Sequence, residues 1–369
     1  MRFPTRSSLA FEPESAYQNP IMDLYKDLAF PLFKQLDPED AHERMASSLE
    51  VASSSLVGRR ALHFLAGNCP SLPLKVMGLR FPNPLGVAAG FDKTVRLAPG
   101  LAELGFGHVE VGTLTPKPQE GNPRPRVFRI AERGAILNRM GFPNPGLEDV
   151  LPRLECLSRV KRSWVLGVSI GKQKETPLAQ ALEDYVRCFQ AVAPYADYVA
   201  VNISSPNTPG LRELQGGNYL LHLLSGLMEE ARHFAQEHDG KHPPVAVKIA
   251  PDVKARELEE MLDALQTAGV QGIIVSNTTL SRAGFDPEWQ QQTGGISGRP
   301  LTQRTTRLIE EVRKRLHDPE FPIIGVGGVF TAQDARDKLN AGASLVQVYT
   351  GLVYEGPGMA GKILRGLAG

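Results

Sequence analysis

Residues 323–351 read IIGVGGVFTAQDARDKLNAGASLVQVYTG, and the architecture of the whole chain can be argued outward from them. Two short and almost wholly apolar runs, Ile323–Val329 and Ser344–Thr350, flank a segment with helical periodicity, Ala332–Asn340. Apolar runs of this length are typical of parallel strands that are covered by helices. Thr331 is a typical N-cap for the intervening helix. The stretch therefore predicts a strand–helix–strand unit.

Six further apolar runs of the same kind precede this unit. They are Leu85–Gly90, His108–Leu114, Trp164–Ile170, Asp197–Ser204, Val245–Ala250 and Gly272–Thr278. The clearest helical stretches between the runs are Leu178–Val192, Tyr219–Phe234, Ala255–Ala268 and Thr302–Leu316. Eight strands with right-handed crossovers predict an α/β fold, a closed (β/α)8 TIM barrel. A doubly wound open sheet is the alternative, but the turn after the first run reads AAGFDK and not G-x-G-x-x-G.

The chain of 369 residues is longer than a barrel requires. A barrel takes roughly 250 residues, so about a hundred need another explanation. We assign residues 1–79 to a small N-terminal helical extension and residues 80–369 to the barrel. Within the extension we expect two amphipathic helices, Ile21–Leu36 and Ala41–Val57, split at Asp37–Pro38.

The rest of the surplus is an enlarged loop after the second strand, at about residues 115–163. We expect two strand-like runs in it, Val127–Ile130 and Ala135–Asn138, and a helix at Leu147–Val160. Loops of this length in compact domains usually carry function.

Composition and charge narrow the classes of function. The formal net charge is +1, which gives no basic footprint for nucleic acid. Three scattered cysteines argue against a disulfide framework and against a metal cluster. The chain has no apolar run of about 18 residues and no signal peptide at its start. We therefore expect an intracellular protein, and leave open whether it lies on a membrane surface.

In a (β/α)8 barrel the functional site lies at the carboxyl ends of the strands. Those ends carry polar residues, including two lysines, Lys93 and Lys248, which indicate a bound anion or an electron-rich ring. The glycine turns GVGG and YTG follow the last two strands, where such barrels often hold a phosphate. These features favour a phosphorylated cofactor, although GVGG is as typical of a plain strand–helix turn.

Three polar loops supply further ligand-binding chemistry. Asn202–Gly210 carries hydroxyls and amides between two prolines, a pattern that can aim a hydroxyl at a substrate but is also typical of a capped turn. Asn277–Thr279 and Asn138–Phe142 add amides, hydroxyls and a guanidinium. Together the loops suit a planar, anionic, amide-bearing ligand.

Nine motifs across about residues 20–367 resemble the dihydroorotate dehydrogenase family, in order and spacing its membrane-associated, quinone-reducing class 2. They are AAGFDK (88–93), GTLTPKPQEGNPRPRVFR (112–129), NRMGF (138–142), NISSPNTPGLR (202–212), VKIAPD (247–252), SNTTL (276–280), TGGISGRPL (293–301), IIGVGG (323–328) and GASLVQVYTG (342–351). The resemblance implies one FMN per chain, oxidation of dihydroorotate to orotate in pyrimidine biosynthesis, and reoxidation of the flavin by a membrane quinone.

The resemblance also implies site residues. Those expected at the cofactor are Ala89, Gly90, Phe91, Asp92, Lys93, Thr113, Ser169, Asn202, Lys248, Ser276, Gly298, Gly328, Tyr349 and Thr350. Those expected at the substrate are Lys93, Asn138, Arg139, Met140, Gly141, Phe142, Asn202, Asn207, Asn277 and Thr278. Ser205 matches the catalytic base, where the soluble class has cysteine, and we expect Thr208 and a water to relay its proton. Ser169 departs from the asparagine that is usual in the family.

In the class that the chain resembles, the N-terminal helices form an apolar funnel for quinone. His42, Arg129 and Tyr349 would then lie near the quinone head, and the apolar residues of the first helix would line the funnel or face the membrane: Leu24, Leu28, Phe30, Leu32 and Phe33. The other interpretation is that these helices pack on the barrel and that His42 is a surface histidine. The resemblance further implies a monomer that is peripheral on the cytoplasmic face of a bacterial membrane, or on the mitochondrial inner membrane in a eukaryote.

Several other functions compete with this interpretation. A dihydrouridine synthase is disfavoured by the neutral charge, and a dihydropyrimidine-reducing enzyme by the lack of an iron–sulfur cysteine cluster. A soluble fumarate- or NAD-linked dihydroorotate enzyme is disfavoured by Ser205 and by the N-terminal extension. Lys93, Ser205 and Asn207 argue against a non-catalytic barrel that only binds quinone or lipid.

Overall fold

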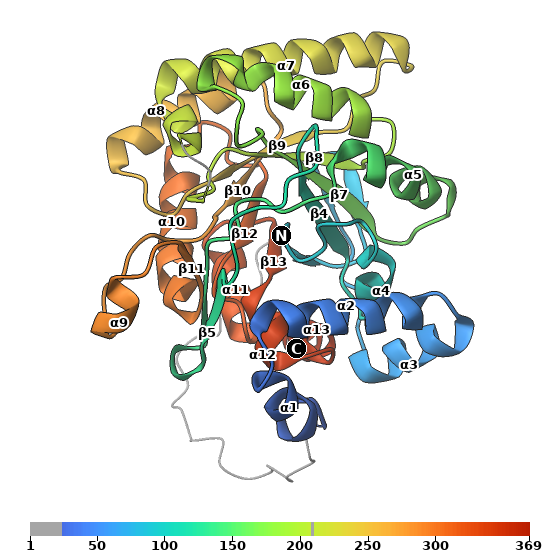
Figure 1. Ribbon diagram of the computed structural model, residues 1–369. Helices are drawn as coiled ribbons and strands as arrows, with labels where there is room; N and C mark the ends of the chain where they lie inside the picture. Colours follow the sequence, from blue (N-terminus) through green and yellow to red (C-terminus); the bar gives the residue numbers. More distant parts are fainter. Residues whose placement is uncertain (1–23, 208–209) are drawn as a thin grey trace.

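The computed structural model describes residues 24–207 and 210–369, and its centre is a closed barrel of eight parallel strands (Figure 1). In order around the barrel the strands are β3 (Leu85–Val87), β4 (His108–Leu114), β7 (Val165–Ile170), β8 (Tyr198–Asn202), β9 (Val245–Ile249), β10 (Gly272–Val275), β12 (Ile323–Val326) and β13 (Leu345–Val348). Each coincides with a predicted apolar run, so the (β/α)8 fold is confirmed.

Amphipathic helices surround the barrel and bury one face against the strands. In α8 (Ala255–Ala268) the buried positions Leu258, Met261, Leu262 and Leu265 follow the helical repeat. The other covering helices are α4 (Ala98–Glu103), α5 (Gly146–Arg159), α6 (Ala181–Val192), α7 (Gly217–Glu237), α10 (Thr302–Arg315), α11 (Ala332–Asn340), α12 (Thr350–Glu355) and α13 (Met359–Ala368). The largest core cluster lies between these helices and the strands.

A hairpin that the sequence analysis did not predict closes the amino-terminal end of the barrel. Its strands are β1 (Leu74–Val76) and β2 (Leu79–Phe81), paired antiparallel across the predicted 79/80 domain boundary. The Phe81 ring is buried among inward-facing residues such as Ala200, Ala246 and Leu345. The opposite end of the barrel is therefore the open one.

The enlarged loop after β4 is partly ordered as a second, small sheet. Strands β5 (Val127–Ile130) and β6 (Ala135–Asn138) form where they were predicted, and β11 (Gly295–Gly298), which was not predicted, pairs with β6. This pairing sets Asn138 opposite Gly295 and brings the ends of two distant loops together over the barrel mouth.

The N-terminal extension is helical, but its helices differ from those expected. A π-helix η1 (Leu24–Ala29) and α1 (Phe30–Lys34) precede α2 (Pro38–Ser53), which begins at the predicted Asp37–Pro38 break. The predicted helix Ala41–Val57 is wrong at its carboxyl end. The Ser55 hydroxyl accepts a hydrogen bond from the Gly58 amide at 3.0 Å and starts a separate helix, α3 (Leu56–Ala66). Residues 21–23 of the predicted first helix lie outside the described residues.

A buried ion pair fastens α2 to the loop after β4. The Glu39 carboxylate accepts hydrogen bonds from Nη2 of Arg126 at 2.7 Å and from its Nε at 3.0 Å. The same guanidinium donates to the carbonyls of Glu120 and Asn122, and both ion-pair side chains are almost fully buried. Figure 1 shows α2 and α3, in blue, beside α4 at this end of the molecule. Within the two described ranges, no helix is both long and apolar enough to span a bilayer.

Candidate active site

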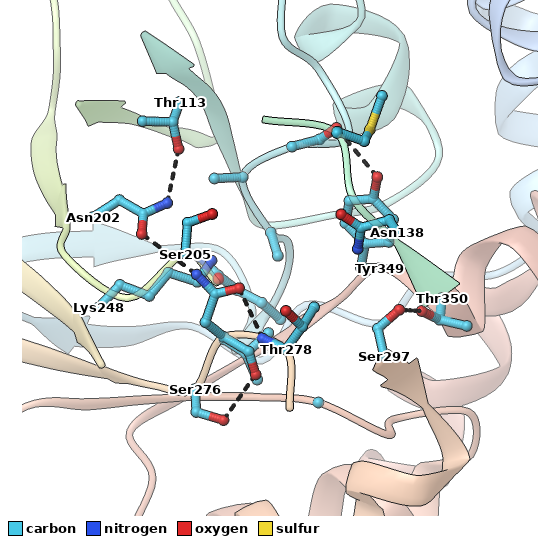
Figure 2. Close-up of a pocket in the computed structure, with 18 of the residues that line it drawn as sticks. Thr113, Asn138, Asn202, Ser205, Lys248, Ser276, Thr278, Ser297, Tyr349 and Thr350 are labelled. Atoms are coloured by element: carbon cyan, nitrogen blue, oxygen red, sulfur yellow. Dashed lines mark hydrogen bonds between the residues drawn. The ribbon is translucent and has the colours of Figure 1, made fainter. Parts of the chain in front are cut away.

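A polar cavity opens at the carboxyl ends of the barrel strands (Figure 2). Its walls include most of the residues predicted for cofactor and substrate. They are Ala89, Gly90, Lys93, Thr113, Asn138, Met140, Gly141, Phe142, Asn202, Ser205, Asn207, Lys248, Ser276, Asn277, Thr278, Gly298, Gly328, Tyr349 and Thr350. The structure thus brings these residues together from at least six different strand ends and loops.

A chain of hydrogen bonds orders one wall of the cavity. The Thr113 hydroxyl accepts a hydrogen bond from Nδ2 of Asn202 at 2.9 Å, and Oδ1 of Asn202 accepts one from Nδ2 of Asn277 at 3.4 Å. Ser169 is fully buried behind this wall, with its hydroxyl 3.0 Å from that of Thr113. Ser169 is not among the cavity-lining residues. Its shorter side chain supports Thr113 from behind.

Lys93 brings a cation to the cavity wall. Burial lowers the pKa of its ammonium to about 8, while the carboxylates of Glu39 and Asp92 oppose that shift. The lysine therefore carries its charge at neutral pH and loses it at mildly alkaline pH. An ammonium with this exposure to a cavity is suited to a carboxylate ligand.

Ser205 lies in the loop after β8 and is almost fully buried at the cavity wall. Its Oγ accepts a hydrogen bond from the Asn207 backbone N–H at 3.2 Å. The Asn207 side chain in turn donates to Oδ1 of Asn138 at 3.2 Å. Asn138 is the last residue of β6 in the small sheet, so this bond connects the Ser205 loop to that sheet. Thr208, the predicted relay, lies outside the described residues.

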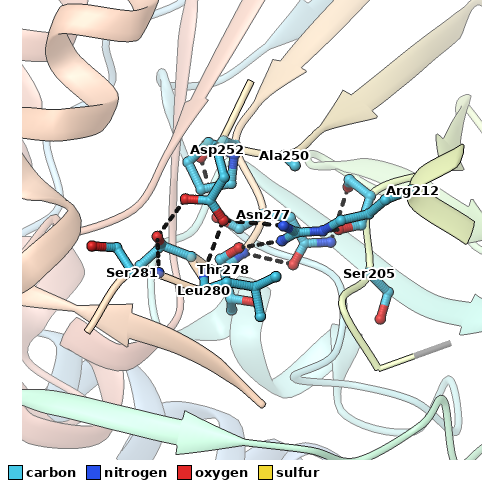
Figure 3. A network of polar contacts seen from close by, with 12 residues as sticks. Ser205, Arg212, Ala250, Asp252, Asn277, Thr278, Leu280 and Ser281 are labelled. Atoms are coloured by element: carbon cyan, nitrogen blue, oxygen red, sulfur yellow. Dashed lines mark hydrogen bonds and ion pairs between the residues drawn. The ribbon is translucent and has the colours of Figure 1, made fainter. Parts of the chain in front are cut away.

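One guanidinium connects the Ser205 loop to the Asn277 loop (Figure 3). Arg212 donates to the Ser204 carbonyl at 3.2 Å and to the Thr278 carbonyl at 3.0 Å, and pairs with Asp252 at 3.1 Å. Arg212 lies in a recognised motif but was not predicted as a site residue. Only the fold shows that its two carbonyl partners belong to two loops of the same site.

Besides Ser169, two more of the predicted residues are not available as side-chain contacts. The Asp92 carboxylate faces away from the cavity and accepts hydrogen bonds from the amides of Leu97 and Ala98, among others, at the start of α4. Arg139 stacks on the Phe128 ring, at 4.6 Å from its centroid, and donates to Gln292. Neither residue lines the cavity, because each is held by protein partners of its own.

A second cavity, of about 840 Å³, lies between the N-terminal helices and the barrel. His42, Arg129 and Tyr349, the residues predicted for the quinone head, all line it, and so do Phe30 and Phe33. Leu28 and Leu32 point outward and are 50% and 68% exposed. The side chain of Leu24 lies outside what the structure describes.

The two cavities share a wall. Lys93, Asn138, Met140, Pro143 and Tyr349 line both of them. Phe91, predicted at the cofactor, lines only the second cavity, where its ring lies 5.6 Å from that of Tyr349 and 5.1 Å from that of His42. A group bound in the first cavity can therefore be approached from the second across a thin layer of side chains.

Comparison with known proteins places this site in a family. The family model for dihydroorotate dehydrogenase matches residues 71–369. "Dihydroorotate dehydrogenase (quinone)" of Methylococcus capsulatus is 46% identical over 94% of the chain and 99% of that protein. The protein of the same name from Roseiflexus sp. is 48% identical over 92% of both chains.

The chain belongs to the dihydroorotate dehydrogenase family. Its quinone-dependent class is shown by the names of the relatives. Among solved structures, the dihydroorotate dehydrogenase of Eimeria tenella in complex with ferulenol superposes with a TM-score of 0.81, at 38% identity and with 90% of each chain covered. These matches decide against the dihydrouridine synthase and dihydropyrimidine-reducing alternatives.

The dihydroorotate dehydrogenase family match begins at residue 71, after the N-terminal helices, whereas the quinone-dependent relatives align over almost the whole chain. Several cavity residues were not predicted from the sequence, chiefly Gln347, Ser297 and Leu301. The Ser297 hydroxyl lies in a hydrogen bond of 2.7 Å with Thr350. Ser297 belongs to the TGGISGRPL motif, but strand β11, which orients its side chain, was not predicted.

Proposed function

We propose that this chain oxidises dihydroorotate to orotate on a bound FMN and passes the electrons to a membrane quinone, a step of pyrimidine biosynthesis. One observation carries the proposal: a polar cavity at the barrel mouth shares a wall with a larger and mostly apolar cavity under the N-terminal helices. A redox cofactor in the first cavity is thereby accessible to a polar substrate on one side and to an apolar acceptor on the other.

The residues of the first cavity fit FMN. Thr113, Asn202, Lys248 and Ser276 present hydroxyl, amide and ammonium groups, and Oε1 of Gln347 is buried with no hydrogen-bond partner in the described part of the chain. Such an orphan acceptor is costly unless a ligand N–H satisfies it, and the flavin ring carries one. When bound, FMN would supply the acceptor for a hydride.

The glycine turns at the ends of β12 and β13 fit the phosphate of that cofactor. Gly328 has φ of +70°, and a Cβ there would lie 2.3 Å from the Thr302 backbone nitrogen. The close approach of these backbones leaves no room for a side chain at Gly328, so a phosphate there would be held by backbone N–H groups.

On the substrate side, Lys93 would bind the carboxylate, and the amides of Asn138, Asn207 and Asn277 would hold the edges of the pyrimidine ring. Ser205 would take the C5 proton as its own hydroxyl proton passes on to water, while the C6 hydride would go to the flavin; this requires both groups within near-attack distance. The Asn207 N–H that donates to Ser205 Oγ stabilises negative charge developing on that oxygen.

The pKa of Lys93 predicts how substrate capture depends on pH. Because that pKa is lowered to about 8, the ammonium is charged below this pH and neutral above it. We expect kcat/KM for dihydroorotate to fall above pH 8, approaching tenfold per pH unit. The pH profile of initial rates measures this. Lys93→Arg, whose guanidinium stays charged, should abolish the alkaline fall; a wild-type profile that stays flat to pH 9.5 would contradict the assignment.

The second cavity is proposed to admit the quinone. Burial and the neighbouring Lys93 lower the pKa of His42 to about 4, so its imidazole is uncharged at neutral pH. Burial raises the pKa of Tyr349 to about 12, which keeps its phenol protonated. Within residues 1–79 of the proposed division, the described helices are the quinone-access part, and the β1–β2 hairpin belongs with the barrel. His42 lines the inner end of this cavity together with Tyr349 of the barrel, and both groups are neutral and polar.

The outer face of α2 and α3 is proposed to contact the membrane. Apolar side chains are exposed there: Val51 at 71%, Leu56 at 73%, Val57 at 79% and Phe64 at 84%. Arg59 and Arg60, on the same helix as Phe64, are exposed and can contact anionic headgroups. This face supports peripheral attachment. The family resemblance adds the proposal of a monomer at the cytoplasmic side of a bacterial membrane or at the mitochondrial inner membrane.

The triple substitution Leu56→Ser, Val57→Ser, Phe64→Ser is expected to weaken partitioning onto phosphatidylglycerol-containing vesicles by at least tenfold, since each lost apolar side chain removes buried area. Co-sedimentation measures this. A matched control, Val160→Ser with Tyr219→Ser, removes similarly exposed apolar groups from the barrel and should leave partitioning unchanged. Equal losses in both variants would rule out α3 as the contact surface.

The activity itself is tested by the absorbance of bound flavin. Purified protein should be yellow, should be bleached anaerobically by dihydroorotate, and should recover its colour when a short-chain ubiquinone analogue is added. Fumarate and NAD⁺ should not restore the colour. Protein that binds no flavin, or that dihydroorotate does not bleach, would overturn the proposal.

A further inference from the structure

A fully buried carboxylate lies inside the barrel, beneath the first cavity. Glu110 is on β4 and is wholly inaccessible to solvent. Its Oε2 accepts hydrogen bonds from the Tyr198 hydroxyl at 2.9 Å and from Nε2 of Gln347 at 3.0 Å, and its Oε1 lies 3.5 Å from Nζ of Lys248. A carboxylate surrounded in this way by donors acts only as an acceptor.

Two of the three partners reach the cofactor cavity while Glu110 itself does not. Lys248 and Gln347 both line that cavity, and Lys248 is only 5% exposed. His108, two residues earlier on β4, adds no charge, because burial lowers its pKa to about 3. Beneath the cavity the ammonium of Lys248 is therefore balanced by the carboxylate of Glu110.

We propose that Glu110 is a positioning residue that sets the reduction potential of the bound flavin through Lys248. The proposal rests on the proposed function, since it needs FMN in the first cavity. A neutral ring that accepts a hydride from C6 of the substrate gains one negative charge. A cation next to the ring favours that state, and an anion behind the cation offsets part of the effect in a water-poor interior.

This charge balance matters because the flavin takes part in two half-reactions: dihydroorotate reduces it and quinone reoxidises it. An uncompensated Lys248 would make the flavin easier to reduce by dihydroorotate but harder to oxidise by quinone. Paired with Glu110, the ammonium keeps its place and its hydrogen-bonding ability while its field at the ring is reduced. Gln347, held by the same carboxylate, is fixed with its orphan oxygen free for the ligand.

Glu110→Gln tests the inference, because it keeps the shape and removes the charge. In the FMN-loaded full-length protein, the two-electron reduction equilibrium should shift about 10- to 100-fold toward reduced flavin, an upward change of roughly 30–60 mV in midpoint potential. Anaerobic reductive titration against a reference dye measures it. Tyr198→Phe removes one hydrogen bond to Glu110 and no charge, and should leave the reduction equilibrium within about twofold of wild type, or about 10 mV.

The double variant Glu110→Gln, Lys248→Gln separates charge balance from structural damage. Removing both charges should return the potential toward the wild-type value, whereas damage would accumulate. If Glu110→Gln alone does not fold, Lys248→Gln should shift the equilibrium at least tenfold toward oxidised flavin, since an unpaired carboxylate remains.

The outcomes are distinguishable from failure of the proposed function. Wild-type protein that binds no flavin, or is not bleached by dihydroorotate, overturns the function. If wild type is bleached normally, then an unchanged or lowered potential in flavin-loaded Glu110→Gln overturns the inference alone. If Glu110→Gln does not fold, an unchanged potential in Lys248→Gln overturns the inference.

Discussion

Replacing Ser205 with alanine is expected to slow the reduction of bound flavin by dihydroorotate about 10²- to 10⁴-fold, the usual contribution of a positioned general base. Ser205 is the buried hydroxyl at the cavity wall whose oxygen receives a backbone N–H, from Asn207. Anaerobic stopped-flow in the absorption band of oxidised flavin measures this half-reaction without any quinone.

The controls separate lost chemistry from lost structure. Ser281→Ala removes a hydroxyl from a neighbouring loop outside the cavity and should not change the rate. In Ser205→Ala, FMN content and the reoxidation of chemically reduced flavin by quinone should stay at wild-type values. Ser205→Cys, with a thiol pKa of about 8.5, should regain part of the activity at alkaline pH. Near-normal flavin reduction in Ser205→Ala across the pH range would show that another group takes the proton.

Closing the second cavity is expected to lower kcat/KM for a short-chain ubiquinone analogue by at least about 10²-fold while flavin reduction by dihydroorotate continues. Ala46→Trp places an indole in that cavity, which Ala46 lines from α2. Overfilling a packed site costs about 1–3 kcal/mol in stability, so the fold should survive. Steady-state quinone reduction and single-turnover flavin reduction are measured side by side.

Ala61→Trp is the matched control, because Ala61 is exposed on α3 and lies outside the cavity lining. A chain that begins at residue 70 gives the same test more drastically, and should lose quinone turnover yet keep flavin reduction if the barrel folds. Unchanged quinone kinetics in Ala46→Trp would mean that quinone reaches the flavin by another route.

The barrel could be predicted from sequence because its strands are continuous apolar runs and its helices have a strong repeat. The elements that were missed are short and depend on distant partners. Strand β11 consists of four residues, two of them glycines, and exists through pairing with β6. The break at Ser55 depends on one side-chain cap in an otherwise helical pattern.

The site residues that lie at strand ends or in family motifs could be predicted from the sequence. Motifs do not tell a backbone contact from a side-chain contact, so Asp92 and Arg139 were expected at ligands although each is held by the protein. Glu110 and Gln347 lie within strands and face into the barrel, where only the register of neighbouring strands shows which polar groups meet. Arg212 likewise required the spatial proximity of two loops.

The buried pair of Glu39 with Arg126 has a consequence for how this architecture can be recombined. It joins the N-terminal helices to the loop that carries the β5–β6 hairpin, so the two are expected to behave as one unit when segments are exchanged with relatives. Foreign helices that lack a carboxylate in place of Glu39 would leave the Arg126 guanidinium buried without its counter-ion, a change that typically costs about 3–5 kcal/mol. Such chimeras should therefore fold well only when residues 115–126 are exchanged together with the helices.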